Sequence, residues 1–438
     1  MIRSWSLSSP SSPGDGRQSR ALTVIGRLWR ILSVALRRSG QIGWRSASGA
    51  LGRSEPGGRQ SYARQARLGL EELGPTFVKL GQVLSTRSDI VPPDLQHELS
   101  LLRDHASSIP TEDVMSELEE NIGSPISDVF RTFEVIPFAS ASIGQVHRAT
   151  LTDGRQVAVK VRRPAIRSQI DADITILTGL TRLTRVSRRL RNYDLGSVMD
   201  EFSRLLRAET DFTTEASNAE VIRRTFANDA AVCIPTIVRD LSGDSILVME
   251  WIEGTSLTDS DALSAARVDR TAMARTIVHA YVKMIVQSDR FHADPHPGNF
   301  IAMSGGRLGL VDFGEVGTVS ATTRSALTRL LVAVVSRDSK VLTDAVLSIS
   351  RECRPVERTG LSRDLDALLD PIIDGELQDI KLGRLLRDLL HVLRRQGLML
   401  PANLAVLIKT VIGCEATAEE LDPTLSLSSF LSEFGSAA

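Results

Sequence analysis

The sequence predicts an α+β protein with two lobes, one built on antiparallel strands and the other mainly helical. Three observations predict it: alternating apolar residues between positions 129 and 162, two further strand-like runs between 234 and 252, and helical apolar spacing beyond Ser320. The chain has 438 residues, 42% hydrophobic and 24% charged, which excludes a disordered or fibrous protein. Four regions are expected: residues 1–60, 61–128, 129–254 and 255–438.

Charge and cysteine content exclude further classes of protein. A formal net charge of -1 argues against binding of nucleic acid along the whole chain, so no nucleic-acid partner is expected. Cys233, Cys353 and Cys414 lie far apart without a CxxC pair, which excludes a disulfide framework and a zinc knuckle and favours the reducing cytoplasm. No run of 18 or more apolar residues occurs, so no transmembrane segment is predicted.

Residues 1–60 form a basic arm whose only acids are Asp15 and Glu55. At 100° per residue the arginines between Arg20 and Arg38 share one arc, and apolar residues that include Trp29 fill the opposite side. This amphipathic basic helix is expected to lie on a membrane surface, at the inner face of the membrane. Two alternatives stay open: a helix docked on the protein's own acidic body, and an organellar transit peptide. Residues 1–19 and 46–60 are expected to be flexible.

The next two regions alternate helices and strands. In residues 61–128, Gly74-Pro75 predicts the start of a helix and Pro92-Pro93 its end. In residues 129–254, three antiparallel strands are expected, followed by a helical insertion and two more strands; the predicted strands are 128–137, 143–151, 156–161, 234–240 and 245–252, and the insertion covers 164–228.

Residues 255–438 are expected to form a helical lobe. A long helix over 270–288 leads into a polar loop, a hairpin around Gly305-Gly306 and a strand that ends at Val311, and helices follow Ser320. This order of elements is similar to the two-lobed plan of protein kinases.

The polar loop carries the strongest chemical signal. In His292-Ala-Asp294-Pro-His296-Pro-Gly-Asn299, an aspartate precedes an asparagine by five residues, and Asp312-Phe-Gly314 follows at a strand end. Phosphoryl transfer needs a carboxylate that orients the attacking oxygen and oxygen ligands that hold Mg²⁺ beside it. The ordered pair of motifs therefore predicts Asp294 as the catalytic aspartate, which accepts the proton of the attacking oxygen, and Asn299 with Asp312 as metal ligands.

Lys160 is the candidate for contact with the phosphates. It ends Val157-Ala-Val-Lys160 on a predicted strand, and the whole chain has only six lysines. A carboxylate from the following helical segment must hold such an amine in place. Glu209, Asp211 and Glu215 are candidates, and we choose Glu215.

The predicted phosphate-covering loop has a single glycine. It reads Phe138-Ala139-Ser140-Ala141-Ser142-Ile143-Gly144-Gln-Val-His147. Alanine limits how closely backbone N–H groups approach phosphates, so nucleotide handling should differ from that of ordinary kinases. A simple hairpin of small residues is the competing interpretation.

Together these motifs resemble the UbiB/AarF family of atypical kinases, which is associated with isoprenoid quinone metabolism. Its hallmarks are Lys79-Leu-Gly-Gln82 for KxGQ, the alanine-rich loop above, and Glu209-Thr-Asp211 for ExD. The resemblance implies a two-lobed protein-kinase-like fold with an N-terminal KxGQ helical extension, in which Lys79 contacts the ExD carboxylates. It also implies that ATP and Mg²⁺ are cofactors, that Lys160 pairs with Glu215, and that residues from Glu250 to Ile252 face adenine.

The departures from the family pattern concern substrates and attachment. No Ala-Pro-Glu follows Asp312, so a platform for a peptide substrate is unsupported, and Ser140 stands where alanine is common. The membrane hairpin that ends some bacterial relatives has no counterpart. Attachment to a membrane is therefore expected through the N-terminal arm or through partners in a biosynthetic complex.

We expect an ATP- and Mg²⁺-dependent atypical kinase or ATPase that acts on a lipid or quinone precursor at a membrane surface. One alternative is a small-molecule phosphotransferase of the aminoglycoside-kinase type, and another is a non-catalytic, nucleotide-sensing scaffold. A metallohydrolase that uses His292, Asp294 and His296 is a further alternative that the spacing permits.

Overall fold

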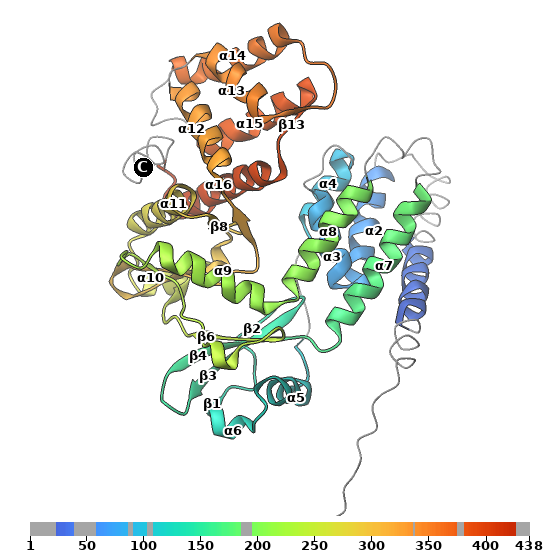
Figure 1. Cartoon of the computed structure of the whole chain (residues 1–438), viewed down its shortest axis with the longest axis vertical. Helices are drawn as coiled ribbons and strands as arrows, with labels where there is room; N and C mark the ends of the chain where they lie inside the picture. The colour runs from blue at the N-terminus through green and yellow to red at the C-terminus, as the bar shows by residue number, and fades with distance from the viewer. Residues whose placement is uncertain are drawn as a thin grey trace, which may run out of the picture. The chain divides into compact units, whose positions relative to one another are not determined.

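The chain folds into two compact units. The computed structural model in Figure 1 describes residues 23–38, 58–85, 91–102, 108–184, 195–335, 338–374 and 381–425. The first unit comprises residues 1–212 and 241–247, and the second comprises 213–240 and 248–438. Most of the residues for which the sequence predicts flexibility, in 1–19 and 46–60, lie outside the described ranges.

Helices make up most of the first unit. The helices α2 (Gly58–Leu73), α3 (Pro75–Ser85) and α4 (Pro93–Ser100) pack on one another, and α3 also packs on α8 (Leu195–Glu209), the neighbour of α7 (Ile166–Thr184) (Figure 1). The predicted helix after Gly74-Pro75 is thus present as α3. Proline suits its first turn because the N–H groups there have no partner within the helix.

The basic arm contains a helix over residues 23–38, close to the predicted range. Its Val34 is buried and packs with Leu73 and Phe77, at the end of α2 and in α3. Arg27 is also buried and forms an ion pair with Asp173 of α7. The inner face of this helix is therefore docked on the body of the first unit, as one of the alternatives predicts, whereas contact with a membrane and the transit-peptide alternative stay predictions.

The sheet of the first unit has the order β1-β3-β4-β6, with β2 also on β3. Its strands are β1 (Phe130–Phe133), β2 (Ala139–Ser140), β3 (Gly144–Leu151), β4 (Gln156–Arg162) and β6 (Ile246–Glu250), which begins in this unit. The helices α5 (Thr111–Ile122) and α6 (Ile126–Val129) precede it. The three predicted antiparallel strands are present, although the first is shorter because α6 takes up its start.

One predicted strand is wrong. Residues 234–240 contribute only an isolated bridge between Ile237 and Met249 and the short helix η1 (Arg239–Leu241). Pro235 lacks an N–H group for a ladder, which explains why a continuous strand does not form. The extended residues upstream, β5 (Val232–Cys233), pair with a strand of the second unit instead.

The second unit places a small sheet beside long helices. Its sheet has the order β5-β10-β9-β7, with β7 (Thr255–Ser256), β9 (Phe300–Ala302) and β10 (Leu308–Leu310). The β9–β10 hairpin turns through η3 (Ser304–Gly306), where Gly305 and Gly306 both have a φ of 74° that suits glycine. The strands β8 (Arg290–His292) and β11 (Val316–Thr318) pair separately. The helices before them are α9 (Phe212–Thr225), α10 (Ser260–Ala265) and α11 (Arg270–Gln287).

The part of the second unit after Ser320 is helical, as predicted. Leucines from successive helices form one core cluster there, and α16 packs on α11 (Figure 1). The helices are α12 (Ala321–Val335), α13 (Ser339–Ile349), α14 (Arg358–Asp374), α15 (Leu382–Gln396) and α16 (Ala402–Leu421), with the short strands β12 (Arg351–Glu352) and β13 (Leu398–Met399).

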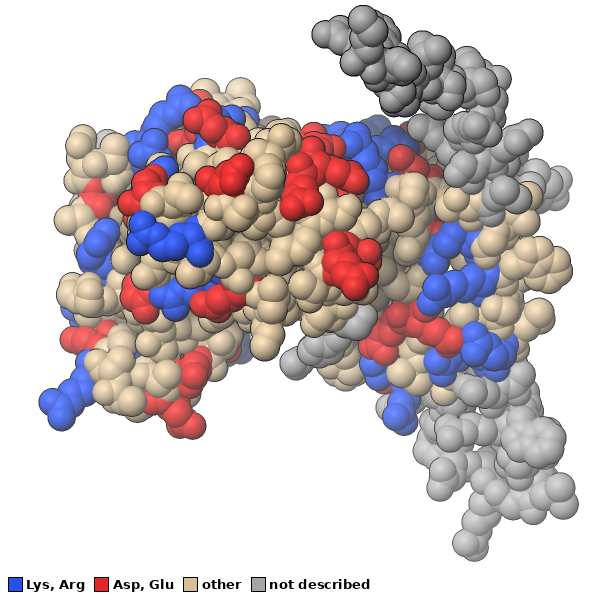
Figure 2. All heavy atoms as spheres, turned by 90° about the horizontal axis from the view of Figure 1, so that it is seen from below, with Lys and Arg blue, Asp and Glu red and all other residues tan. Residues whose placement is uncertain are grey.

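The surface mixes both signs of charge. On the face drawn in Figure 2, lysine and arginine side chains are interspersed with aspartate and glutamate side chains. Among the described residues, no helix has the length and apolar character that a membrane span requires.

Candidate active site

The loop between β8 and β9 brings Asp294 and Asn299 together. The Asn299 Nδ2 donates hydrogen bonds to the Asp294 backbone oxygen at 3.1 Å and to its Oδ2 at 2.9 Å. The short helix η2 (Pro297–Asn299) makes this approach possible, and His296 caps it by accepting a hydrogen bond from Gly298 N at 3.0 Å. Because the amide nitrogen of Asn299 is committed to Asp294, its amide oxygen points the other way.

Asp312 lies after β10 with a φ of 62°. A non-glycine residue in this region costs on the order of 1–3 kcal/mol, and such residues cluster at functional sites. Gly314 N donates to Asp312 Oδ1 at 3.1 Å, which fixes the carboxylate over the turn. The sequence-predicted metal ligands Asn299 and Asp312 thus lie in the same unit, on adjoining segments joined by a hydrogen bond from Val311 N to Asn299 O.

His292 connects the two motifs. Its fully buried ring places Nε2 2.6 Å from the Asp312 carbonyl oxygen and Nδ1 3.3 Å from Asp294 N. A carbonyl oxygen can only accept, so Nε2 carries the proton and Nδ1 accepts from the Asp294 N–H. Both ring nitrogens therefore brace the loop.

The metallohydrolase alternative fails on the same contacts. His296 Nδ1 faces Gly298 N and His292 faces backbone groups, so neither ring is directed to a shared metal with Asp294. Within the described ranges no cluster of three or more His, Cys, Asp or Glu side chains could hold a metal ion. Carboxylate and amide oxygens, as in Asp312 and Asn299, are the protein ligands that suit Mg²⁺ when phosphates and water complete its shell.

Helix α16 supports the loop from behind. Thr417 Oγ1 donates to Pro295 O at 2.6 Å, and Thr410 Oγ1 shares its proton between Val406 O of its own helix at 2.9 Å and Ala293 O at 3.3 Å, so the two threonines lie on either side of Asp294. A Cβ on Gly413 would lie 2.7 Å from Pro295 Cγ, so glycine allows the close approach. The motif analysis missed these three residues, although a stripe of small residues at helical spacing could have indicated a packing face.

Helix α9 supports the Asp312 segment. Glu215 lies in its first turn and is buried, and Asn218 one turn later donates to Phe313 O at 3.1 Å. Arg290 holds Asn218 Oδ1 at 2.6 Å. Asn218 was also missed by the motif analysis; its spacing of three residues from Glu215 is the signal that could have found it.

Lys160 belongs to the first unit, in β4, whereas Glu215 belongs to the second. Its Nζ lies 5.2 Å from the centre of the Phe212 ring, a cation–π distance. Val157 and Val159 are buried as the strand alternation predicts. The pairing of Lys160 with Glu215 stays a prediction.

The KxGQ and ExD motifs meet in the first unit. Lys79 of α3 forms an ion pair with Glu209 at the end of α8, and both side chains are about one-fifth exposed. Gln82, on the same helix face, donates to Leu102 O at 3.4 Å. Asp211 follows in the turn after α8, where Arg162 donates to Thr210 O at 2.7 Å.

Gly81 explains the glycine of the KxGQ motif. A Cβ at this position would meet the methyl groups of Leu102 at 2.2 Å and Leu70 at 2.9 Å. The glycine therefore lets α3 pack closely between α2 and the end of α4, which positions the face that carries Lys79.

The alanine-rich loop is tied to the end of β4. Arg163 donates from Nε and Nη2 to Ala141 O, both at 3.1 Å, and Arg163 N donates to Ile143 O at 2.8 Å. Gly144 approaches β4 so closely that a Cβ would lie 2.5 Å from Val161 O. The Ser140 hydroxyl is buried and has no hydrogen-bond partner among the described residues, and its contact with a phosphate stays a prediction. Ser142 lies in this same turn.

Glu250 and Ile252 lie at and beyond the end of β6, in the second unit. Glu250 Oε2 accepts a hydrogen bond from Thr236 N at 3.3 Å, and Ile252 is buried. A Cβ on Gly309 would lie 2.7 Å from Ile252 Cγ2, so β10 packs closely on this residue. Contact with adenine stays a prediction for both.

Comparison with family models and curated proteins gives consistent matches. A model described as ABC1 atypical kinase-like domain matches residues 101–346, and one described as UbiB helical domain matches residues 365–426. The chain is 35% identical over 382 residues to a probable protein kinase UbiB of Marinobacter nauticus, covering 85% of this chain and 69% of that protein. It is 32% identical over 411 residues to an uncharacterised Synechocystis protein, covering 94% of this chain but 60% of that longer relative.

A solved structure shares the fold. It is the complex of Rv3197 with erythromycin from Mycobacterium tuberculosis, which matches with a TM-score of 0.56 at 23% sequence identity. The match covers 81% of this chain and 90% of that one, so the similarity extends over both units.

Proposed function

Because the chain belongs to the ABC1 atypical kinase-like family and is similar to UbiB proteins, we propose that it is an ATP- and Mg²⁺-dependent kinase or ATPase. Its acceptor would be a lipid or an isoprenoid quinone precursor at a membrane surface. The relatives named UbiB support the quinone assignment, and the absence of Ala-Pro-Glu after Asp312 in the sequence supports an acceptor other than a peptide.

One observation carries the proposal: His292 joins the backbone of Asp294 to the backbone of Asp312, and Asn299 binds Asp294 from the same loop. An acid, an amide oxygen and a second carboxylate are thereby held on one rigid frame. Phosphoryl transfer depends mainly on such positioning and on charge stabilisation, because the protein makes few covalent bonds in the reaction.

Each side chain has a distinct role in the proposed mechanism. Asp294 orients the attacking hydroxyl or water and takes its proton, with its Oδ2 fixed by Asn299. The Asn299 amide oxygen and the Asp312 carboxylate would hold Mg²⁺. The metal would neutralise charge on the phosphates, and ATP would supply the phosphoryl group with ADP as the leaving group. Lys160, held by Glu215, would contact the phosphates, and the loop from Ala139 to Gly144 would cover them.

The test compares three full-length proteins for ATP turnover and ATP binding. Asp294→Asn should lower turnover by about 10²–10⁴-fold and leave binding of Mg²⁺-ATP intact, since general-base catalysis contributes that much. Asp289→Asn, five residues earlier and exposed, is the matched control and should retain turnover. Turnover should be measured with detergent and a phenolic lipid analogue present.

Two results would point elsewhere. Unchanged complementation of a deletion strain by Asp294→Asn would favour the nucleotide-sensing scaffold, and transfer to aminoglycosides in preference to lipids would favour the small-molecule phosphotransferase. Lipid and quinone profiles of a deletion strain carrying the wild type or Asp312→Asn would identify the pathway affected. Normal quinone levels in both the deletion strain and the Asp312→Asn strain would contradict the quinone assignment.

A further inference from the structure

The helix over residues 23–38 turns its large apolar side chains away from the first unit. Leu28 and Leu32 are 40% and 46% exposed, and Ile25, Trp29 and Leu36 are 53%, 70% and 73% exposed. They recur every three or four residues, with Trp29 beside Leu28, and so form one stripe along about three helical turns. We call these five residues the apolar ridge.

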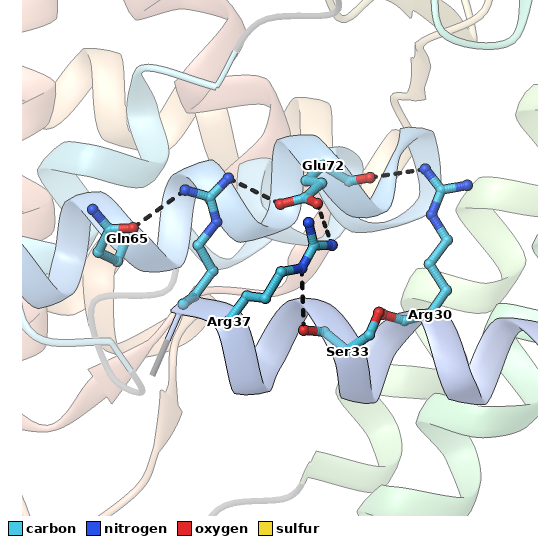
Figure 3. Close-up of polar contacts among 6 residues, drawn as sticks. Arg30, Ser33, Arg37, Gln65 and Glu72 are labelled. Carbon is cyan, nitrogen blue, oxygen red and sulfur yellow. Dashed lines mark hydrogen bonds and ion pairs between the residues drawn. The ribbon is translucent and has the colours of Figure 1, made fainter. Parts of the chain in front are cut away.

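The arginines of the same helix face the protein (Figure 3). Arg37 and Arg38 bind the two carboxylate oxygens of Glu72 at 2.6 and 2.9 Å, and Arg30 donates to the Glu72 backbone oxygen at 3.1 Å. Arg27 binds both carboxylate oxygens of the buried Asp173, at 2.7 and 2.6 Å. The sequence suggests that the arginine face of this helix contacts lipid head groups. In the structure, most of that face contacts the body of the first unit instead.

This orientation is the reverse of an ordinary surface helix, whose charges face water and whose apolar stripe faces the core. The ion pairs with Glu72 and Asp173 fix the helix, so it cannot simply rotate to hide the apolar ridge. A contiguous apolar stripe that is held outward is typical of a surface that another phase or molecule covers.

We propose that the apolar ridge inserts into the interface of an anionic lipid bilayer. The ridge is a convex stripe on a helix, and Trp29 within it suits the boundary between head groups and acyl chains. In the sequence, residues 1–60 hold ten arginines and only two acids, and this positive charge favours a bilayer with anionic head groups over a neutral one. This inference rests on contacts within the first unit and does not depend on the proposed catalytic activity.

The proposal connects the bilayer to the KxGQ helix. On its inner side the same helix packs through Val34 on Phe77 of α3, and α3 carries Lys79 two residues later. The apolar ridge therefore places α3 one helix layer from the lipid and orients the first unit relative to the bilayer.

The test is flotation of the full-length protein with vesicles of phosphatidylcholine and phosphatidylglycerol. Leu28→Glu and Leu32→Glu should each weaken partitioning by about tenfold, because each removes one apolar side chain from the lipid and adds a charge of the wrong sign. The triple variant that adds Leu36→Glu should not float. Leu180→Glu and Leu205→Glu, on equally exposed leucines of α7 and α8, are matched controls and should float like the wild type.

Several outcomes would overturn the proposal. They are a wild type that does not float, a triple variant that floats like the wild type, controls that lose flotation equally, and a larger loss from Arg30→Gln than from Leu28→Glu. Sedimentation without lipid tests whether a second copy of the chain covers the apolar ridge instead. A dimeric wild type with a monomeric triple variant would show that the apolar ridge is a protein interface. Circular dichroism of every variant confirms that these exposed substitutions leave the fold intact.

Discussion

Substitution of Asp173 by alanine tests how the N-terminal helix is held. The Arg27 and Asp173 side chains are 9% and 0% exposed, and Arg27 Nη2 also donates to Leu73 O at 3.0 Å. Removal of one partner from a buried ion pair costs about 3–5 kcal/mol, because the other charge stays buried without compensation. We expect the helix to undock locally, since its opening is cheaper than unfolding the first unit.

Hydrogen–deuterium exchange of the full chain measures this opening. A loss of about 3–5 kcal/mol corresponds to amide exchange over residues 23–38 that is faster by roughly two to three and a half orders of magnitude, at about 1.4 kcal/mol for each factor of ten. Asp171→Ala is the matched control on the same helix: Asp171 is half exposed and pairs with Arg207 at 3.1 Å, a contact worth at most about 1 kcal/mol.

A double variant separates charge from packing. Arg27→Met combined with Asp173→Leu should restore much of the protection, because an apolar pair can replace a buried ion pair. The reasoning is refuted if Asp173→Ala accelerates exchange by less than tenfold, or if Asp171→Ala has an equal effect.

Three further predictions concern the site and its supports. Thr417→Val should lower the rate of ATP turnover by about tenfold with unchanged ATP binding, because it removes the hydrogen bond to Pro295 O beside Asp294. Thr417→Ser keeps the hydroxyl and should restore turnover, and Thr343→Val in α13 is the control and should have no effect. A parallel loss of ATP binding in Thr417→Val would contradict a positioning role. Burial lowers the pKa of His147, so its neutral form is favoured in the folded state and the free energy of unfolding should fall as the pH drops below about 6.5, the usual value for an unfolded chain. Urea titrations between pH 7.5 and 5 should show that the free energy of unfolding falls less in His147→Gln than in the wild type. In His97→Gln, at an exposed position, it should fall as in the wild type. Equal pH dependence in His147→Gln and the wild type would refute the prediction. Gly144→Ala should lower the free energy of unfolding by about 1–3 kcal/mol, measured by the same titration, because its Cβ would overlap a carbonyl oxygen of β4; an unchanged midpoint would refute this.

Local patterns predicted the elements with strong periodicity or clear boundaries. The α3, β3, β4 and α11 segments follow from proline positions, strand alternation and apolar spacing, and the spacing of Asp294, Asn299 and Asp312 follows from the chemistry of phosphoryl transfer. The prediction of a strand at 234–240 was wrong because Pro235 has no N–H group to donate to a neighbouring strand. The prediction gave more weight to the apolar pattern than to this local signal.

Long-range contacts could not be predicted in the same way. The supports from Thr410 and Thr417 lie more than a hundred residues from the loop that they bind. The direction of the N-terminal helix depends on Asp173 and Glu72, which no pattern within residues 20–38 reveals. An amphipathic pattern identifies two faces, but the partners of each face decide which one turns inward.

The bracing of the loop by His292 has a consequence for the thermodynamics of ligand binding. Its contacts, together with those of Asn218, Asn299 and Thr417, join protein groups to one another and fix the loop at both ends. Little ordering entropy should then be lost when a ligand enters the second unit. Most of its binding free energy would then come from contacts with the phosphates themselves, because the loop around Asp294 needs no rearrangement.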